Sequence, residues 1–440
     1  MELTSRGAEL QAGAAAPVIT PPLDISMAGG YGDVRARGVL NDLRARALVL
    51  DDGTTTVAIA ALDLCSIDPS VVLRAQRRAA ELTGIPADRI MVTCTHTHSG
   101  PLTEPNAWAT PDPIYLDVLA RRIGDAVALA HQDRRPARLL VGHGHETSVA
   151  FNRRYWMRDG SLRTNPRFQD PAIVRPAGPL DPDVGILRVE DAATGACLAL
   201  LVNYALHVAV VGGQRYSADF PGVLERHIRK IEGPETVVLF APGCCGDINH
   251  WDMSKPGPQS GQPVAEGIGA VLAGETLKVT PRCVPIAVEG GIRYRRRQVD
   301  LPLRVPSAEE RAWAEQRFPF PMREMDALGL ESVAAYRMWW INRHGQPTVT
   351  VEVQALAIGD LAYVTLPAEI FVELGLAVKR QSPFPHTMIG MLNGSSVDYY
   401  VPTEKAYGEG GYEVTNSPLA PGSGETLVDT ALELLHEVHA

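Results

Sequence analysis

Two histidines in the segment Thr95-His96-Thr97-His98-Ser99-Gly100-Pro101 are the residues best placed to do chemistry. They end an apolar run that reads as a β-strand, and Gly100-Pro101 then forces the chain to turn. Side chains at i and i+2 of a strand point to the same side, so His96 and His98 are expected to converge beyond the strand end. Two imidazoles there suit a metal site, or one metal ligand beside an acid/base. The alternative is a pair of surface histidines.

Three further polar residues follow predicted strands. His207 ends the apolar run CLALLVNYALH, Glu369 lies in LPAE, and Tyr400 lies in DYYVPT. Taken singly, each residue has a purely structural interpretation. His207 would be a buried core histidine, Glu369 an acidic residue at a helix start, and Tyr400 a packing side chain. Together they matter more, because α/β sheets gather their sites at strand ends.

The order THTHSGP, NYALH, LPAE and YYVPT resembles that of the neutral ceramidases. Those proteins are zinc amidases that cleave the N-acyl bond of ceramide. The resemblance runs from about residue 18, with the stretches VITPP and GYGDVRARGVLNDLRARA, to about residue 413. It therefore implies a zinc-dependent amide hydrolase over nearly the whole chain.

The resemblance also implies roles for single residues. It implies one zinc ion per chain, with these four ligands: His96, His207, Glu369 and Tyr400. His98 would act as acid/base beside the metal. Arg153, in FNRR, matches an asparagine–arginine pair near the family's site, and Tyr412, in GGYEV, matches a tyrosine that donates to the substrate carbonyl.

This chemistry is coherent without the family name. Two imidazoles and a carboxylate leave zinc an open position for water, whose pKa falls towards about 7 on the metal. His98 could accept the proton of that water, while zinc, Tyr412 and Arg153 stabilise an oxyanion. The same attack would serve an esterase or lactonase, and a catalytically inactive metal-containing binding protein is a further alternative. Iron or manganese also occupy sites of this ligand type.

Two departures from the family bear on the substrate. Asn249 stands where the family normally has a serine, which leaves ceramide only one candidate among small or lipid-like amides. We also expect the family's C-terminal immunoglobulin-like domain to be missing from this chain. The neighbouring Cys244 and Cys245 follow a buried strand and are expected to be inert thiols rather than nucleophiles.

The elements that must position these residues alternate between strands and helices, which predicts an α/β fold with a mixed central sheet flanked by helices. We expect a single domain over residues 1–440, with 1–15 flexible. Strands are expected at 55–64, 89–96, 138–151, 184–189, 197–205, 235–241, 349–358 and 361–366. Helices are expected from Pro69 and at 112–131, 219–231, 262–278, 307–341, 368–381 and 424–437.

Two other groups of residues have competing interpretations. The segment 311–344 is rich in Trp, Phe and Met, including Phe320, Met322 and Met325, and is either an apolar rim over the site or an amphipathic helix packed on the core or on a second subunit. Asp63 and Asp219 are candidate partners of the ligand histidines, with helix capping an equal alternative for Asp219.

Composition and net charge argue against some classes of binding partner. The net charge of −10 and a pI near 5.7 argue against nucleic acid and anionic membrane surfaces. No apolar run is long enough to span a membrane, and the N-terminus lacks the pattern of a signal peptide. The six cysteines show no CxxC spacing. We therefore expect a cytoplasmic protein, with a homo-oligomer possible.

Overall fold

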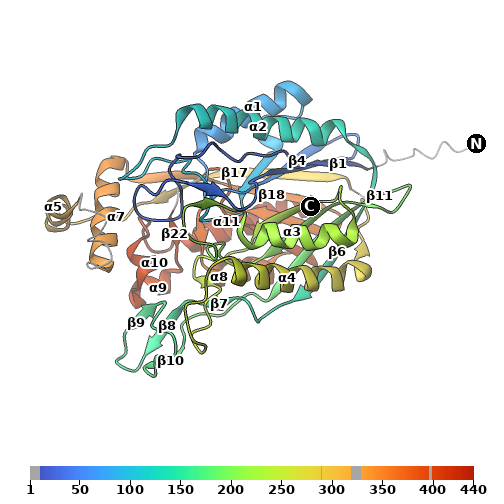
Figure 1. Cartoon of the computed structure of the whole chain (residues 1–440). Coiled ribbons are helices and arrows are strands. Elements are labelled where there is room, and N and C mark those ends of the chain that lie inside the picture. Colours follow the sequence, from blue (N-terminus) through green and yellow to red (C-terminus); the bar gives the residue numbers. More distant parts are fainter. Residues whose placement is uncertain (1–9, 289, 319–328, 396–398) are drawn as a thin grey trace, which may run out of the picture.

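The computed structural model describes residues 10–288, 290–318, 329–395 and 399–440. Figure 1 shows the path of the chain through two sheets and the helices around them. The sequence-based expectation of an α/β fold with a mixed sheet flanked by helices is confirmed. What was expected to be one central sheet is two sheets packed face to face.

The larger sheet has nine strands in the described part of the chain. Across the sheet these are β14 (Val237–Pro242), β12 (Cys197–Tyr204), β11 (Asp183–Asp191), β6 (Arg135–His145), β1 (Gln11–Ala15), β3 (Ala45–Asp51), β4 (Thr56–Leu62) and β5 (Ile90–Cys94), with β16 (Val284–Pro285) beside β6. The β12–β14 and β4–β5 pairs are parallel and the other pairs are antiparallel.

The smaller sheet runs in the order β17 (Ile292–Pro302), β18 (Thr348–Ile358), β19 (Leu361–Thr365) and β21 (His386–Gly390). Short ribbons complete the strands: β2 (Gly38–Val39) with β13 (Arg215–Tyr216), β7 (Phe151–Asn152) with β15 (Ile248–Asn249), β20 (Glu369–Ile370) with β22 (Tyr400–Val401), and β8 (Arg154–Met157) between β9 (Leu162–Thr164) and β10 (Ile173–Pro176).

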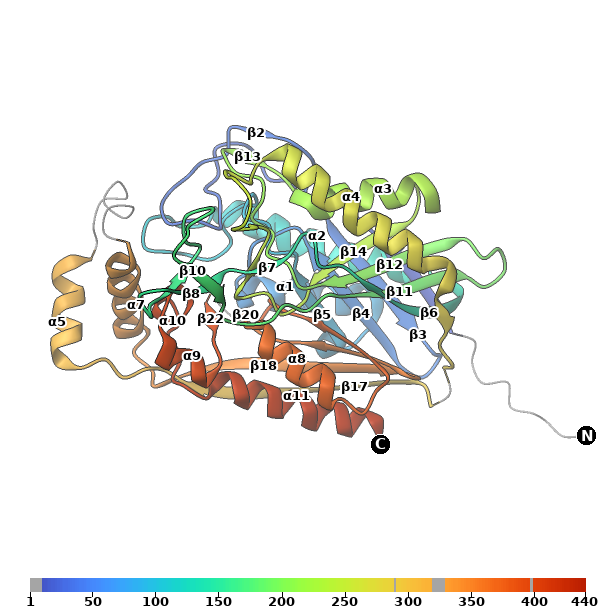
Figure 2. The same ribbon diagram turned by 90° about the horizontal axis from the view of Figure 1, so that it is seen from below.

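Most of the helices in the described part of the chain cover the outer faces of the two sheets. They are α1 (Pro69–Thr83), α2 (Pro113–Gln132), α3 (Asp219–Glu232), α4 (Gln262–Val279), α5 (Ala308–Arg317), α7 (Leu330–His344), α8 (Val372–Gln381), α9 (Glu404–Glu409), α10 (Tyr412–Thr415) and α11 (Ser423–His439), with 3-10 turns at Ala87–Arg89 and Thr280–Arg282. In Figure 2, α3 and α4 lie on one side of the strands and α8 and α11 on the opposite side. The result is four layers, helix–sheet–sheet–helix.

Alternation of side chains along the strands explains these layers. In β3, Ala47 and Val49 face the core shared with helices α1 to α4, whereas Leu48 and Leu50 face the core between the two sheets. Both sets are apolar, so the larger sheet must be covered on both faces. The smaller sheet supplies the opposing side chains of the inter-sheet core, such as Tyr363.

Several boundaries differ from the sequence-based expectations. In the described residues of the range 307–341, where one helix was expected, there are two helices, α5 and α7, which lie away from the sheets at the left of Figure 1. The helix expected from residue 368 begins at Val372, because Glu369–Ile370 pair as a strand with Tyr400–Val401. Residues 11–15, expected to be flexible, form β1 inside the larger sheet.

The two sheets meet where the expected site residues lie. The Met391 backbone N–H, just beyond β21, donates to the Pro242 carbonyl at the end of β14 (3.0 Å), and the Cys94 N–H at the end of β5 donates to the Leu392 carbonyl (3.2 Å). The Asn203 side chain of β12 donates to the Ile389 carbonyl (2.7 Å). Strand ends from both sheets are therefore tied together at one place.

A buried ionic group also ties the larger sheet to its helices. Arg46 of β3 contacts Asp63 at 2.7 Å and also pairs with Glu225 of α3, and all three residues are buried. Burial raises the pKa of Asp63 even though Arg46 acts to lower it. Removing the cation would leave the buried Asp63 without its ion-pair partner, and would leave Glu225 with Arg229 alone (3.5 Å).

We predict that Arg46→Met lowers the free energy of unfolding by about 3–5 kcal/mol, because one partner of a buried ionic group is lost. Urea unfolding monitored by circular dichroism measures this. Arg74→Gln is the matched control, since Arg74 pairs with Asp117 in solvent (2.9 Å) and such pairs contribute at most about 1 kcal/mol. Equal shifts in the two variants would contradict the assignment.

Candidate metal centre

His96 lies in the loop that follows β5, not on the strand itself. Its backbone φ is +70°, in the left-handed region. The loop is fixed by N–H bonds from Thr95 to the Leu62 carbonyl (2.7 Å) and from His96 to the Leu64 carbonyl (2.8 Å). Strand alternation is therefore the wrong reason for the convergence of His96 and His98. A left-handed residue outside glycine costs on the order of 1–3 kcal/mol and is typical of functional sites.

Glu369 is positioned by the β20–β22 ribbon. In this parallel pair Glu369 lies in register with Tyr400, and the Glu369 N–H donates to the Tyr399 carbonyl (3.0 Å). Ala368, just before it, also has a positive φ of 58°. Gly246 packs so closely on this ribbon that a Cβ there would lie 2.4 Å from the Glu369 carbonyl oxygen. Only glycine allows that approach.

The structure brings His96, His207 and Glu369 together in a buried group. The His96 Nε2 and His207 Nε2 atoms lie 3.0 Å apart, and Glu369 Oε2 lies 3.4 Å from the first and 3.6 Å from the second. All three side chains are at most 3% exposed. The group satisfies the spacing expected of metal ligands.

Backbone carbonyls decide which imidazole nitrogen faces the centre. His96 Nδ1 lies 2.9 Å from the Cys65 carbonyl oxygen, and His207 Nδ1 lies 3.4 Å from the Cys245 carbonyl oxygen. A carbonyl oxygen only accepts, so each Nδ1 must donate its N–H. Burial first, and then the charges of neighbouring groups, lower the pKa of His207 well below its usual value. Neutral His207 therefore directs the lone pair of Nε2 towards His96 and Glu369.

This arrangement fits a metal ion. Two imidazole lone pairs 3.0 Å apart repel each other unless a cation lies between them. A proton can join two of the three atoms, whereas a metal ion can bind all three. Tetrahedral zinc, with bonds of roughly 2.0–2.1 Å, separates its ligand atoms by about 3.3 Å. The observed separations of 3.0, 3.4 and 3.6 Å bracket that value.

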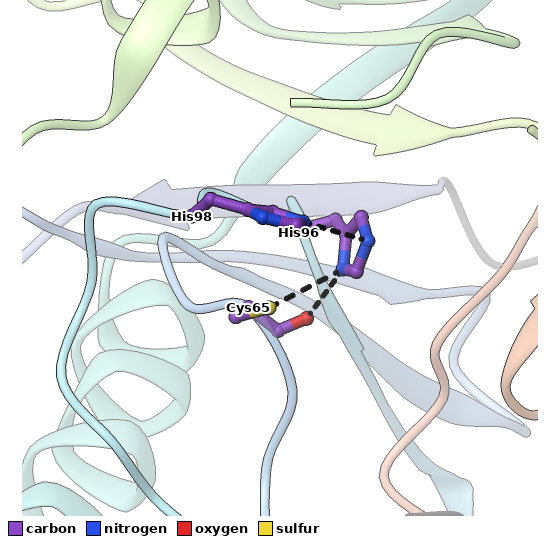
Figure 3. Close-up of side chains that lie close together, drawn as sticks. All are labelled: Cys65, His96 and His98. Carbon is purple, nitrogen blue, oxygen red and sulfur yellow. Dashed lines mark hydrogen bonds between the residues drawn. The ribbon is translucent and has the colours of Figure 1, made fainter. Parts of the chain in front are cut away.

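Cys65 was missed by the sequence analysis. Figure 3 shows it beside His96, and its sulfur lies 3.6 Å from His96 Nδ1. Cys65, His96 and His98 form a second group with the spacing of metal ligands. However, the Cys65 contact is to Nδ1, on the opposite side of the ring from His207. We therefore interpret Cys65 as support for His96, because its own carbonyl orients the ring.

His98 lies directly beside this group, as its interpretation as an acid/base requires. Its Nε2 atom is 3.3 Å from His96 Nε2, and its side chain is only partly buried. Gly29 packs against it: a Cβ at Gly29, whose φ is +87°, would lie 2.5 Å from the His98 Cβ. His98 thus has a fixed position between the buried group and a cavity.

Arg153 lies under the two tyrosines predicted for the site. Its Cζ atom is 5.2 Å from the Tyr400 ring centroid and 5.9 Å from that of Tyr412. Burial opposes the charge of Arg153, but Tyr400 and Glu413 outweigh it and raise its pKa well above the usual value. Glu413, at 2.7 Å from Arg153 Nε, was also missed by the sequence analysis, although it directly follows Tyr412.

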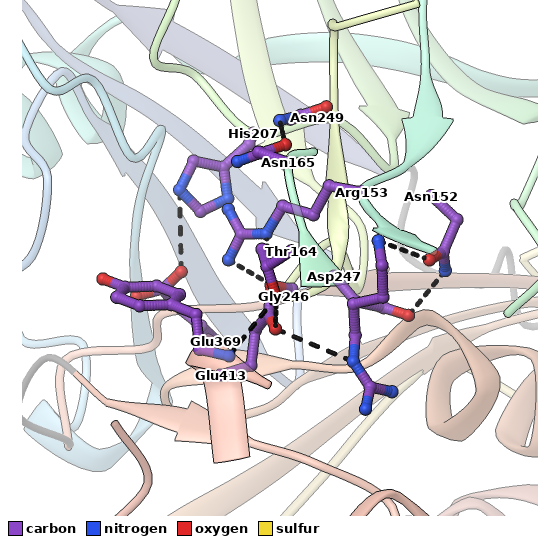
Figure 4. A network of polar contacts seen from close by, with 12 residues as sticks. Asn152, Arg153, Thr164, Asn165, His207, Gly246, Asp247, Asn249, Glu369 and Glu413 are labelled. Carbon is purple, nitrogen blue, oxygen red and sulfur yellow. Dashed lines mark hydrogen bonds and ion pairs between the residues drawn. The ribbon is translucent and has the colours of Figure 1, made fainter. Parts of the chain in front are cut away.

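The Gly246–Asn249 turn is held by a network of polar contacts (Figure 4). Asp247 accepts from Asn152 Nδ2 (2.7 Å) and from the Val372 N–H (2.8 Å), and burial raises its pKa to about 6. Asn249 donates to Asn165 (2.8 Å) and accepts from the Trp251 N–H (3.1 Å). Asn249 therefore has a structural role and does not line the cavity described below.

The thiols next to this turn match the expectation of inert cysteines. Cys244 and Cys245 are both buried. Burial raises the pKa of each thiol above its usual value, so neither is a thiolate near neutral pH.

Asp63 and Asp219 do not contact the ligand histidines, so their interpretation as histidine partners is wrong. Asp63 accepts from the Arg44 N–H (2.9 Å) and pairs with Arg46. Asp219 accepts from the N–H groups of Val210 (2.9 Å) and Val211 (2.7 Å), in the loop after His207. The orienting acceptors of the histidines are backbone carbonyls, which no sequence pattern marks.

A cavity of about 360 Å³ opens onto this group of residues. His98, Glu369, Tyr400 and Tyr412 line one side, and Trp340 of α7 lines another. Both interpretations of segment 311–344 apply in part to α7, because Trp340 lines the cavity and also packs against the core of the smaller sheet. Phe320, Met322 and Met325 lie outside the described residues. The role of Tyr400 as a fourth ligand stays a prediction, although it lines the cavity beside Glu369.

The chain is similar to known neutral ceramidases, in part of its sequence and in its fold. No protein-family model matches the chain. The neutral ceramidase of Mycobacterium tuberculosis (strain ATCC 25618 / H37Rv) is 24% identical over 244 residues, which are 50% of this chain and 37% of that protein. The match thus spans well under half of that relative's length.

Similarity to solved structures covers more of the chain. The crystal structure of neutral ceramidase from Pseudomonas aeruginosa matches with a TM-score of 0.76 at 19% identity, covering 98% of this chain and 75% of that one. A ceramidase complexed with C2 matches with the same TM-score and coverage at 17% identity. The chain is therefore a distant relative of the neutral ceramidases and has their fold, with buried histidine and glutamate side chains that could bind a metal ion.

Proposed function

We propose that the chain is a zinc-dependent hydrolase that cleaves an amide (N-acyl) bond. The observation that carries this proposal is the buried group of two Nε2 atoms and one carboxylate oxygen, spaced 3.0, 3.4 and 3.6 Å apart. Fold alone would not suffice, because one fold can host several activities. This group lies next to a cavity and next to His98, whose imidazole could serve as the acid/base that hydrolysis requires.

His96, His207 and Glu369 would hold one zinc ion, and Tyr400 is the predicted fourth ligand. Imidazole and carboxylate ligands suit zinc, although iron and manganese bind similar sets of ligands. When bound there, the metal would supply Lewis acidity to the substrate carbonyl and acidify a water molecule. The remaining chemistry falls to residues that line the cavity or orient its walls.

His98 is placed to move protons. Its Nε2 atom, 3.3 Å from a ligand nitrogen, can accept a proton from the attacking water and then donate it to the leaving nitrogen. Tyr412 lines the same cavity and can donate to the oxyanion that forms on the carbonyl carbon. Arg153 lies under both tyrosine rings and positions them, while Glu413 neutralises its charge.

The substrate we infer is a small or lipid-like amide. Aromatic residues, among them Tyr31, Trp108 and Trp340, provide apolar surface in the cavity, as an acyl chain requires. Ceramide is only one candidate substrate, because Asn249 stands where the resemblance leads us to expect a serine. None of the helices in the described ranges is long and apolar enough to cross a bilayer. A cytoplasmic location and a homo-oligomer stay predictions from the sequence.

We predict that His207→Ala and Glu369→Gln each abolish stoichiometric zinc, because each removes one of three converging ligand atoms. Elemental analysis of protein purified after zinc loading measures this, with about one ion per chain expected in the parent. His143→Ala is the control: His143 is partly exposed and contacts Asp183 at 2.8 Å, away from the cavity. Unchanged zinc in the first two variants would refute the ligand assignment.

We predict a different result for His98→Ala. Zinc content should stay near that of the parent, while kcat/KM for amide hydrolysis falls by roughly 10²–10⁴, because a general acid/base is lost. Release of fatty acid from an N-acyl substrate, measured beside metal content, distinguishes the roles. Joint loss of zinc and activity would make His98 a ligand. Retained zinc with full activity would remove it from the mechanism.

A further inference from the structure

Arg337 of α7 is buried, at 3% exposure, yet lines the same cavity as His98, Glu369 and Tyr412. Its guanidinium packs on the rings of Tyr336 (5.4 Å) and Trp340 (5.7 Å). A cation is therefore built into the wall of the proposed active site. Arg337 belongs to the segment 311–344, which the sequence analysis singled out for its aromatic and methionine residues.

The partners of Arg337 set it apart from the other buried arginines. Among the described residues, Arg46, Arg153 and Arg154 are the remaining buried arginines, and each pairs with at least one Asp or Glu. Arg337 forms no ion pair with any described residue. Its Nε and Nη2 atoms donate instead to the neutral Asn416 Oδ1, at 3.2 and 2.8 Å.

A buried charge without a counter-ion costs several kcal/mol, so proteins pair such groups. The five N–H donors of a guanidinium match the two oxygens of a carboxylate. Two of the five are used by Asn416, and three are left for a ligand. Stacking on two rings holds the plane of the group fixed, which suits recognition of a planar anion.

Asn416 also links this cation to Tyr412. Its Nδ2 donates to the Tyr412 hydroxyl (3.3 Å), and the same hydroxyl lies 3.0 Å from that of Tyr31. One side-chain amide therefore joins Arg337 to the tyrosine proposed to contact the substrate carbonyl. An anion on Arg337 would lie close to the scissile amide.

Other charges in the cavity restrict where an anion can bind. Asp68 and Glu104 also line it, and neither forms an ion pair with Arg337. These carboxylates repel a substrate carboxylate over the rest of the cavity. Away from the proposed metal ion, a negatively charged substrate group is therefore favoured beside Arg337.

We propose that Arg337 binds a carboxylate of the substrate, and that the substrates are amides with a carboxylate next to the scissile bond, the class of N-acyl amino acids. This inference rests on the proposed amide hydrolysis. Water adds to the carbonyl carbon, the C–N bond breaks, and the nitrogen takes up a proton. The products are a fatty acid and an amino acid.

The test compares two amides with the same acyl chain in the zinc-loaded protein. N-lauroylglycine carries the carboxylate, and N-lauroylethanolamine is a neutral compound of similar size. We expect kcat/KM to favour N-lauroylglycine, and Arg337→Gln to lower that preference by on the order of 10–100-fold through loss of hydrogen bonds to a charged group. Arg337→Lys, which keeps charge but not the planar fork, should restore part of it.

Arg343→Gln is the matched control, because Arg343 lies on the same helix, is exposed, and stacks on Trp339 (4.7 Å) without lining the cavity. Arg343→Gln should keep the preference for N-lauroylglycine over N-lauroylethanolamine. Equal hydrolysis of both amides, with the same ratio in Arg337→Gln, would overturn this inference and leave the proposed function intact.

Hydrolysis of neither amide would instead count against the proposed function. The carboxylate site is then decided by calorimetry of N-lauroylglycine binding to the same protein. Weaker binding to Arg337→Gln than to Arg343→Gln supports the carboxylate site by itself. Equal binding, or none, overturns it.

Discussion

Two imidazole nitrogens that both direct lone pairs into one buried space are the constraint around which this molecule is arranged. The Nδ1 atoms of His96 and His207 donate hydrogen bonds to the carbonyl oxygens of Cys65 and Cys245. The Nε2 atoms of the two rings therefore face each other at 3.0 Å. Glu369 adds a carboxylate oxygen within 3.6 Å of both. Without a cation this arrangement is repulsive, and with a metal ion it becomes a set of ligands.

The backbone that holds these groups is strained. His96 and Ala368 adopt left-handed backbone conformations, and Gly246 packs so closely on the β20–β22 ribbon that no other residue fits. Such strain persists only where surrounding structure is rigid. The two sheets provide this rigidity, because strand ends from both are hydrogen-bonded to each other beside the site.

Charge follows a consistent rule in the interior. Arg46 pairs with Asp63 and Glu225, and Arg153 pairs with Glu413 while it packs under the tyrosine rings. Arg337 departs from this rule, and it does so on the cavity wall. A departure from local pairing at such a place fits the proposed ligand-binding role, in which the counter-ion of Arg337 would arrive with the substrate.

The sequence by itself determined the order of chemical groups at strand ends, and with it the α/β class and most element positions. Apolar runs and Asp-Pro helix starts are local signals, so α1 begins at Pro69 as expected and α2 at Pro113, one residue after its expected start. Tertiary structure alone decided that the strands form two sheets, that residues 11–15 are a strand, and that Glu369 lies in a ribbon rather than a helix. It also decided the contacts of Cys65, Glu413 and Arg337. These contacts join segments far apart in the chain, such as Arg153 and Glu413 with a separation of 260 positions, which no local pattern records.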